Sequence, residues 1–531
     1  MISRFINDRK YNWKIKNIDS IDVLYVGRYK SIFKLIEYFK KGDPPNISEI
    51  KIIVNQMPGN FAIIVETNSW IFGLVDRIGG YRLFYRNDDT GCILSNSPRK
   101  LINKEQGLTF NQDSVLELKM LGYLSGNTTI DKNIFQLRAG EMLLCNKNSN
   151  NYTISSYFIF YTPSVRHQSD KILIEELDDI TNKTIVRNIE DANGRTIWVP
   201  LSGGLDSRLI ICKLKELGCD NLRAYSYGVP GNFDAIRAKE IAHTLGIKWD
   251  FIHTDSTEAR RYFLSKERER YWDFSDGLSV VPSFHGMFAL RNLINSKTMK
   301  PDDVVINGQS GDFIAGEHIP LITEQGANNE ALLDHILNKN YSMRREMLRS
   351  SDLADLMKVK IRNILGEFQY VSNYQEFAKS YEYWGWRERQ TKRVINGQCN
   401  YSYFELNWEL PFWDVEYLNF WANIPIKQKA DRRLFVEYLN KMDFYGVFKN
   451  NNKFMSRWPL NRIYIQFIGN ILSKTLGNKV SNQYYKRLDW YSQYQYLYSL
   501  TGKIEYKKHW ANYKAVYPYM TDIWLSENLK L

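Results

Sequence analysis

The sequence predicts an α/β protein with a β-rich N-terminal part over residues 1–162 and a C-terminal part over residues 171–531 that holds a parallel sheet with a helical extension. Three observations predict this class. A chain of 531 residues is longer than one hydrophobic core normally supports. Strand-like runs dominate up to about residue 160, and helical patterns alternate with short strands from Lys171 onward. Such alternation is typical of a parallel sheet with crossover helices.

The N-terminal strands are predicted from apolar runs that turn residues separate. These runs cover residues 21–26, 61–65, 70–75 and 142–144. Asn68-Ser69 and the Asp-Asp-Thr-Gly stretch at 88–91 are predicted hairpin turns. A polar stretch at 163–170 is the predicted linker between the two parts.

The C-terminal part begins with a predicted helix over 171–190, and shorter elements follow it in alternation. The strands are expected at 196–199, 222–227, 249–252 and 304–306, and the helices at 208–217 and 234–245. Gly218 is a natural stop for the helix that begins at Arg208. Beyond about residue 320 the pattern is mostly helical.

The composition narrows the class of protein. With 44% hydrophobic residues the chain has ample material for a core. Its five cysteines are scattered without a C-x-x-C pair, which argues against a disulfide framework or a zinc site and favours a reducing cytoplasm. No window approaches 18 uninterrupted apolar residues, and the start has no apolar core of signal length, so we expect no membrane span. The net charge of +12 comes from lysines spread through the chain, which favours a solvated surface over a nucleic-acid partner.

The most informative motif is the glycine-rich turn between the strand at 196–199 and the helix at 208–217. A turn of this kind leaves backbone N–H groups at the positive end of a helix, where a phosphate can dock. The turn lacks the Gly-Lys-Ser/Thr ending of a P-loop, and no G-x-G-x-x-G follows a strand here. Asp206 suits Mg²⁺ that bridges phosphates. Ser-Gly-Gly-x-Asp-Ser at 202–207 resembles the pyrophosphate loop of the ATP pyrophosphatases, which split ATP into AMP and pyrophosphate.

Further motifs resemble those of the asparagine synthetase family. In the C-terminal part they are Gly-Val-Pro-Gly-Asn-Phe-Asp at 228–234, Asn-Gly-Gln-Ser-Gly-Asp at 307–312 and Leu-Pro-Phe-Trp-Asp at 410–414. In the N-terminal part, residues 76–85 and 94–97 are similar to the family's Arg-Asp-x-x-Gly-x-x-Pro-Leu-Tyr-Tyr and Ala-Ser-Glu. The resemblance implies an αββα-sandwich of the class II glutamine amidotransferase type, followed by an ATP pyrophosphatase domain.

Two departures from the family bear on function. A working glutaminase of this kind begins with cysteine, whereas Ile2 follows the initiator and no cysteine occurs before Cys92. We therefore expect a degenerate domain that does not hydrolyse glutamine. Gln309 stands where asparagine synthetases carry a Glu, and because Gln cannot take a proton, another group must do the acid–base work.

The resemblance assigns roles to particular residues. Asp206 and Asp312 are the expected magnesium ligands. Lys453, with Lys449 as its rival, is the expected catalytic lysine, and Gln309 and Glu409 complete the catalytic set. Either Glu405 or Glu409 is a candidate for the missing base, with a buried ion pair as the alternative. The residues expected to bind ATP and pyrophosphate are Leu201, Ser202, Gly203, Gly204, Asp206, Ser207, Tyr227, Gly228 and Gly308. Trp272, Asp273, Asp276, His285 and His318 are expected to border the substrate pocket.

The expected activity is an ATP-dependent, AMP-forming amide ligase with ATP and Mg²⁺ as cofactors. Its carboxylate substrate is a small molecule or a peptide, and amidation of a uronate sugar in surface polysaccharide is the favoured case. An intramolecular cyclase of the lasso-peptide or β-lactam type is the alternative. A tRNA-modifying enzyme would be expected to bring RNA-binding domains and cysteine pairs, and a non-catalytic nucleotide binder would not need both aspartates. The resemblance leaves open whether the chain has an ammonia-supplying or carrier partner and whether it forms a homodimer.

Overall fold

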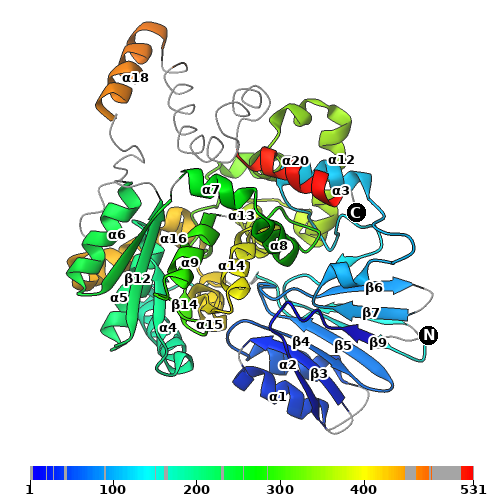
Figure 1. Cartoon of the computed structure of the whole chain (residues 1–531). Coiled ribbons are helices and arrows are strands. Elements are labelled where there is room, and N and C mark those ends of the chain that lie inside the picture. Colours follow the sequence, from blue (N-terminus) through cyan, green and yellow to red (C-terminus); the bar gives the residue numbers. More distant parts are fainter. Residues whose placement is uncertain are drawn as a thin grey trace.

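The computed structural model describes residues 4–18, 21–27, 29–40, 45–88, 91–149, 151–160, 166–228, 232–254, 256–283, 285–448, 462–477, 480 and 516–529. Strands dominate the N-terminal part, and a parallel sheet with many helices forms the rest of the chain (Figure 1). The predicted mixed α/β class is confirmed at this level.

Two β-sheets form the N-terminal part. One sheet has the order β1-β7-β6-β8 and the other the order β10-β9-β5-β4-β3-β2. All neighbours are antiparallel except β1 and β7. The strands are β1 Arg4–Ile6, β2 Lys14–Ile18, β3 Ile21–Gly27, β4 Phe61–Glu66, β5 Trp70–Val75, β6 Phe84–Asp88, β7 Gly91–Ser95, β8 Phe135–Gln136, β9 Glu141–Asn146 and β10 Tyr152–Ser156.

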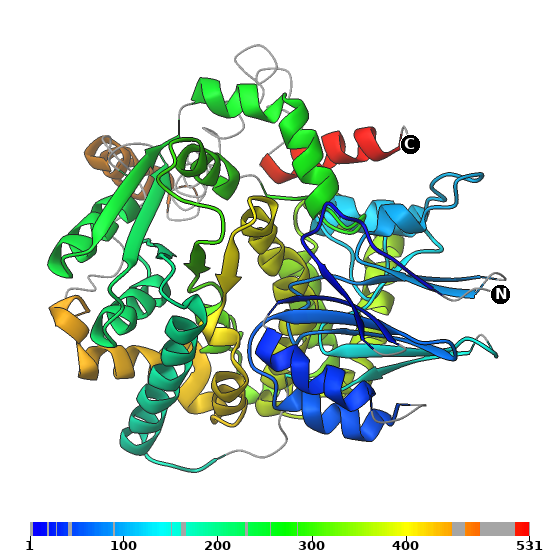
Figure 2. The same cartoon turned by 60° about the horizontal axis from the view of Figure 1, so that its bottom comes forward.

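The two sheets pack face to face, and helices cover the outer face of the larger one (Figure 2). Along β5, Ile71 and Val75 face the smaller sheet, whereas Phe72 and its alternate neighbours face α1 (Tyr29–Phe39) and α2 (Ile47–Asn55). Such alternation follows from the two-residue period of a strand. The apolar runs of the sequence predicted β3, β4, β5 and β9, but they did not predict the other strands of this part or the helices α1 and α2.

A five-stranded parallel sheet with the order β13-β12-β11-β14-β15 forms the centre of the C-terminal part. Its strands are β11 Ile197–Pro200, β12 Leu222–Gly228, β13 Lys248–His253, β14 Val304–Ile306 and β15 Asn407–Glu409. The helices α4 Asp170–Ala192, α5 Leu205–Glu216, α6 Phe233–Thr244 and α9 His285–Asn295 alternate with them. The predicted alternation is confirmed, whereas α5 begins at Leu205 and not at Arg208, and β15 was not expected.

The remaining described elements are helical, and beyond about residue 320 this agrees with the prediction. They are η1 Pro98–Leu101 and α3 Gln112–Leu121 in the N-terminal part, and then α7 Ser256–Phe263, α8 Lys266–Ser275, α10 Gly311–Ile314, η2 Glu324–Gly326, α11 Asn329–Asn340, η3 Arg345–Arg349, α12 Ser351–Leu365, η4 Gly366–Gln369, α13 Tyr374–Trp384, the π-helix η5 Gly385–Val394, η6 Ile395–Gln398, α14 Cys399–Tyr403, η7 Pro411–Trp413, α15 Val415–Ala422, α16 Ile426–Lys429, η8 Ala430–Arg432, α17 Arg433–Met442, η9 Phe444–Gly446, α18 Arg462–Leu476 and α20 Val516–Asn528. Among the described helices, none combines the length and the apolar character that a bilayer crossing requires.

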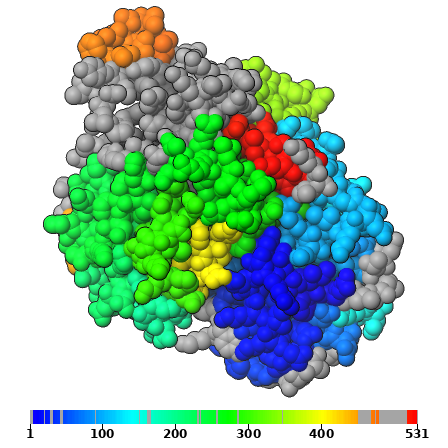
Figure 3. Space-filling model, in the orientation of Figure 1, coloured from blue at the N-terminus to red at the C-terminus, as the bar shows by residue number. Residues whose placement is uncertain are grey.

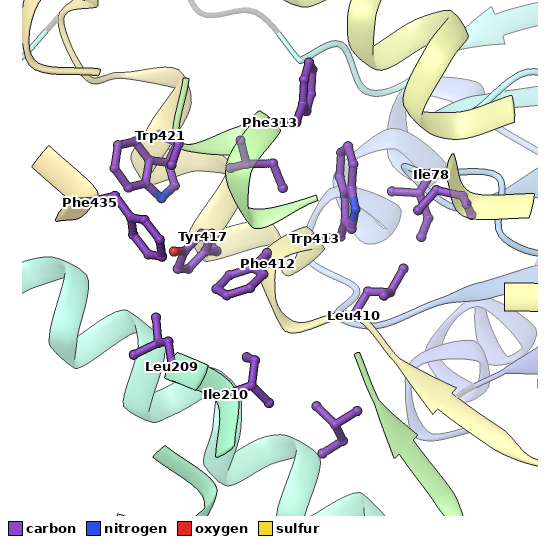
Figure 4. Packing of buried hydrophobic residues seen from close by; sticks show 14 of the residues in the cluster. Ile78, Leu209, Ile210, Phe313, Leu410, Phe412, Trp413, Tyr417, Trp421 and Phe435 are labelled. Atoms are coloured by element: carbon purple, nitrogen blue, oxygen red, sulfur yellow. The ribbon is translucent and has the colours of Figure 1, made fainter. Parts of the chain in front are cut away.

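The helical segments pack on the parallel sheet through one large apolar cluster. Figure 4 shows Phe412 and Tyr417 next to each other, with Leu209 and Ile210 of α5 below them and Phe435 of α17 beside Tyr417. The aromatic pair Phe412–Tyr417 has its ring centroids 5.2 Å apart, a spacing that favours tilted ring packing. The Phe412 ring also lies close to Gly311 after β14, since a Cβ on that glycine would lie 2.8 Å from the ring.

The two parts lie against each other on the face that Figure 3 shows, and they also share this buried cluster. Ile78 and Tyr123 of the N-terminal part belong to it together with Trp386 of η5. The Trp386 indole N–H also donates to the carbonyl oxygen of Arg77 at 2.9 Å. Because core packing is dense, the N-terminal part is tied rigidly to the π-helix.

Candidate active site

The centre of the candidate site is the switch point of the parallel sheet. From β11 the chain passes to β12 on one side, whereas β14 lies on the other side of β11. In open α/β sheets, ligands bind in the crevice at the carboxyl ends of strands where this reversal occurs. The loop 201–204 follows β11 and the loop 307–310 follows β14, so both loops lie at this edge.

The loop after β11 is held by its own side chains. The Ser207 hydroxyl accepts a hydrogen bond from the Ser202 amide at 3.2 Å, and the Ser202 hydroxyl accepts one from the Gly204 amide at 3.2 Å. The Gly203 amide donates to Asp234 Oδ1 at 3.2 Å, which joins this loop to the first turn of α6. Leu201 continues the hydrogen bonding between β11 and β12, since its amide donates to the carbonyl oxygen of Tyr225 at 2.9 Å. The loop is therefore preorganised at the N-terminus of α5.

Asp206 and Asp312, the two aspartates predicted as magnesium ligands, contact each other at this point. Asp206 Oδ2 accepts a hydrogen bond from the Asp312 amide at 2.9 Å. Asp206 Oδ1 is buried and has no hydrogen-bond partner among the described residues. Burial, and then the Asp312 carboxylate, raise the pKa of Asp206 to about 8. A buried carboxylate oxygen without a donor beside a second carboxylate fits a hard divalent cation.

Two glycines let the loop after β14 approach Asp206 this closely. A Cβ on Gly308 would lie 2.8 Å from the carbonyl carbon of Asp206, and a Cβ on Gly311 would lie 2.7 Å from Asp206 Cγ. Between them, Ser310 adopts a φ of 72°, a left-handed conformation that non-glycine residues rarely hold outside functional or strained sites. Gly308 therefore lies against Asp206 and Ser207 in the first turn of α5, and its expected role in phosphate binding stays a prediction.

Asp312 is constrained on both of its carboxylate oxygens. Its Oδ1 accepts a hydrogen bond from the Phe313 amide at 2.7 Å, and its Oδ2 lies 3.4 Å from His318 Nε2. Burial is the largest influence and opposes ionisation of Asp312, but the interactions with His318, the Phe313 amide and the Arg432 charge together outweigh it, so the pKa of Asp312 is lowered. His318 thus contacts an expected site residue directly.

Gln309 lies in a cluster of neutral amides. Its Oε1 accepts a hydrogen bond from Gln398 Nε2, and its backbone amide donates to Asn307 Oδ1 at 3.1 Å. The neighbouring Ser310 hydroxyl donates to Gln390 Oε1 at 2.8 Å. These groups can orient a polar substrate through hydrogen bonds, but amides exchange no protons in the physiological range.

Two arginines near the loop were not recognised from the sequence. Arg208 is buried, and its guanidinium donates to the carbonyl oxygen of Gly203 at 2.6 Å and to that of Val447 at 3.0 Å. Arg237 of α6 donates to the same Val447 carbonyl at 3.4 Å. Burial, followed by the charge of Arg237, lowers the pKa of Arg208 to about 10. The sequence shows that Arg208 lies close to Asp206, and Arg237 close to Asp234, in the predicted helices. Only the tertiary structure shows that the two arginines meet at the Val447 carbonyl oxygen.

Other expected residues lie apart from the two aspartates. Tyr227 and Gly228 end β12, so parallel pairing brings them to the same sheet edge as the loop after β11. Glu409 at the end of β15 accepts a hydrogen bond from Asn60 of the N-terminal part at 3.5 Å. Glu405 is exposed in the preceding turn. Lys453 and Lys449 lie outside the described residues.

Of the residues expected to border the substrate pocket, Trp272, Asp273 and Asp276 make contacts that hold α8 against other helices. Asp276 Oδ2 forms an ion pair with Arg99 at 2.5 Å and accepts a hydrogen bond from the Trp524 indole at 3.0 Å. Asp273 also pairs with Arg99, at 3.0 Å, and Trp272 is buried against Phe263. These contacts join η1, α8 and α20. Among the described residues there is no cluster of three His, Cys, Asp or Glu side chains that could hold a metal by themselves.

Comparison with known proteins supports the interpretation of the sheet and its loops. Residues 194–442 match the family model described as asparagine synthase. This stretch is asparagine synthetase-like. It contains β11, both loops and the two aspartates, and it supports an ATP-dependent amide-forming ligase in general, with nucleotide binding as part of its activity.

The other comparisons add little. No curated protein sequence matches the chain. Among solved structures, the chain is similar to a glutamine phosphoribosylpyrophosphate amidotransferase from B. subtilis, complexed with ADP and GMP. The identity is 10%, the match covers 44% of this chain and 71% of that chain, and the TM-score is 0.18. At this TM-score the likeness supports no argument about fold or ligand.

Proposed function

We propose that this chain is an AMP-forming ligase that adenylates a substrate carboxylate and then joins it to ammonia or an amine. The observation that carries the proposal is the meeting of Asp206 and Asp312 beside a phosphate-type loop at the switch point of the sheet. A loop that only turned the chain would need neither carboxylate, and two adjacent carboxylates without a cation would repel each other.

In the first step, a carboxylate oxygen of the substrate attacks the α-phosphorus of ATP. The bond from that phosphorus to the bridging oxygen breaks, and pyrophosphate leaves with the electron pair. In the second step, nitrogen attacks the acyl carbon, AMP leaves with its oxygen, and the nitrogen loses a proton. The first step brings two anions together, so cationic groups and N–H donors are the main catalytic requirement.

The residues of the site divide this work. The loop 201–204 and Ser207 would hold the phosphates at the N-terminus of α5, with Gly308 packed against them and Tyr227 and Gly228 at the neighbouring strand end. Asp206 and Asp312 would hold Mg²⁺, which neutralises charge on the pyrophosphate when it is bound. Gln309 would orient the substrate, Lys453 would stabilise the developing charge, and Glu409 would take the proton.

The N-terminal part, residues 1–162, would then serve as a scaffold and not as a glutaminase. Cys92 is completely buried, and its hydrogen bond with Cys145, together with burial, raises its pKa far above the ordinary value. A thiol in that state is not a nucleophile. The C-terminal part, residues 171–531, would carry the chemistry, and its nitrogen would come from free ammonia, a partner or the substrate itself.

The proposed substrate is a uronate sugar of a surface polysaccharide, and pyrophosphate release tests the proposal. The purified chain is given ATP, Mg²⁺ and, in turn, aspartate, uronate sugars with ammonia, and peptides with acidic side chains. We expect release with the uronates, and Asp206→Ala should abolish it. Release with peptides and loss of one water from the product would identify a cyclase. Release in the Asp206→Ala variant equal to that of the wild type would overturn the assignment of the site.

A further inference from the structure

His318 lies between the carboxylate of Asp312 and an arginine on the π-helix. Its Nε2 is 3.4 Å from Asp312 Oδ2, and its Nδ1 is 2.9 Å from Arg389 Nη1. The ring also packs edge-on against Phe313, with centroids 5.9 Å apart. Three contacts thus fix the imidazole beside a residue that the proposed reaction requires.

The contact with Arg389 decides which ring nitrogen carries the proton. A guanidinium only donates hydrogen bonds, so His318 Nδ1 must accept and therefore carries no hydrogen. The neutral imidazole then holds its proton on Nε2, the nitrogen that faces Asp312. Arg389 thereby makes His318 a hydrogen-bond donor to the carboxylate.

Arg389 can do this because its helix is anchored on the other side. Arg387 pairs with Glu141 at 2.6 Å, Glu388 accepts from the Gly126 amide at 2.9 Å, and Lys392 donates to the carbonyl oxygen of Leu124 at 2.8 Å. All three side chains of η5 are buried against the N-terminal part. The neighbouring residues Arg389 and Gln390 instead contact the segment that follows β14. Arg389 contacts His318, and Gln390 accepts a hydrogen bond from Ser310.

Asp312 needs such support because its own helix supplies little. It lies in α10, which has only four residues. Its Oδ1 is fixed by the Phe313 amide, which leaves Oδ2 to be oriented by a contact from elsewhere in the chain. Carboxylates that bind metals are commonly oriented by hydrogen bonds from outer residues, and loss of these residues typically weakens metal binding about 10- to 100-fold.

We propose that His318 and Arg389 are positioning residues that orient Asp312 for its magnesium. The proposal rests on the proposed function, because it takes Asp312 to be a ligand of the metal. It also gives the N-terminal part a task, which is to hold the π-helix that carries Arg389.

The test measures ATP binding by calorimetry over a series of Mg²⁺ concentrations, with Asn and Gln variants of His318. A Gln side chain places its amide near the position of Nε2 and keeps a donor for Asp312, whereas Asn ends near Nδ1 and loses that donor. We expect His318→Asn to raise the Mg²⁺ concentration for half-maximal ATP binding about 10- to 100-fold, and His318→Gln to stay close to the wild type. His243→Asn, at an exposed position of α6, is the matched control.

The outcomes separate this proposal from the function on which it rests. A wild-type chain that binds no ATP at any Mg²⁺ concentration would overturn the proposed function. Wild-type ATP binding with His318→Asn indistinguishable from His318→Gln would overturn the positioning role alone. The ¹⁵N spectrum of histidine-labelled protein adds a readout independent of ATP, because the proposal requires His318 to carry its proton on Nε2, and the opposite tautomer would refute it.

Discussion

A methyl group on Gly308 should force the loop after β14 away from the first turn of α5. In Gly308→Ala, the added Cβ would lie 2.8 Å from the Asp206 carbonyl carbon and 2.9 Å from the Ser207 amide nitrogen, well inside the 3.4 Å at which ordinary contact begins. Both neighbours are backbone atoms, so neither can rotate away as a side chain would. Overpacking of this kind costs about 1–3 kcal/mol. The entropic gain from removing a glycine offsets less than about 1 kcal/mol of that.

The expected result is a lower Tm together with weaker ATP binding, because the shift displaces Asp206 and the first turn of α5. For a domain of this size each kcal/mol corresponds to about 2 °C, so the Tm should fall by a few degrees in differential scanning fluorimetry. Gly397→Ala is the matched control, because its Cβ would meet only Gln309 Nε2, at 3.9 Å. If Gly308→Ala keeps both the Tm and the ATP affinity of the wild type, the two loops are not in contact and the site is wrongly assembled.

Three further predictions follow from buried charges. Burial raises the pKa of Asp76 from 3.8 to about 6, so its protonated form favours folding, and stability should fall by up to about 3 kcal/mol as the pH rises from 4 to 6. Urea unfolding across this range should show that slope in the wild type and lose it in Asp76→Asn. Arg208→Lys should weaken ATP binding about 10-fold in calorimetry, since a single ammonium cannot hold both the Gly203 and the Val447 carbonyl oxygens. An unchanged affinity would show that the loop after β11 does not depend on these two hydrogen bonds. Glu141→Leu should lower the free energy of unfolding by about 3–5 kcal/mol, because it leaves Arg387 buried without a carboxylate. Adding Arg387→Met should recover part of this stability. If the two substitutions instead lower the free energy of unfolding additively, the pairing is contradicted.

Most strands of the central parallel sheet could be predicted from the sequence, whereas fewer of the elements around that sheet could be. The runs at 222–227 and 249–252 are short and rich in apolar and aromatic residues, so their pairing as parallel strands followed from the alternation with helices. β15 was missed because Asn407–Glu409 has only three residues and no apolar run, and its pairing with β14 stabilises it as a strand. The start of α5 was placed at Arg208 because the glycines and Asp206 favour turns locally, whereas the helix begins at Leu205.

The candidate site shows the same division between local and long-range information. The sequence by itself determined the turn between β11 and α5, because glycine content and strand–helix periodicity are properties of neighbouring residues. Only the tertiary structure decided that the Asp312 amide donates to Asp206, that Arg389 sets the tautomer of His318, and that Glu409 faces Asn60. Those pairs join residues far apart along the chain, and their approach depends on how helices and sheets pack, which no local pattern encodes.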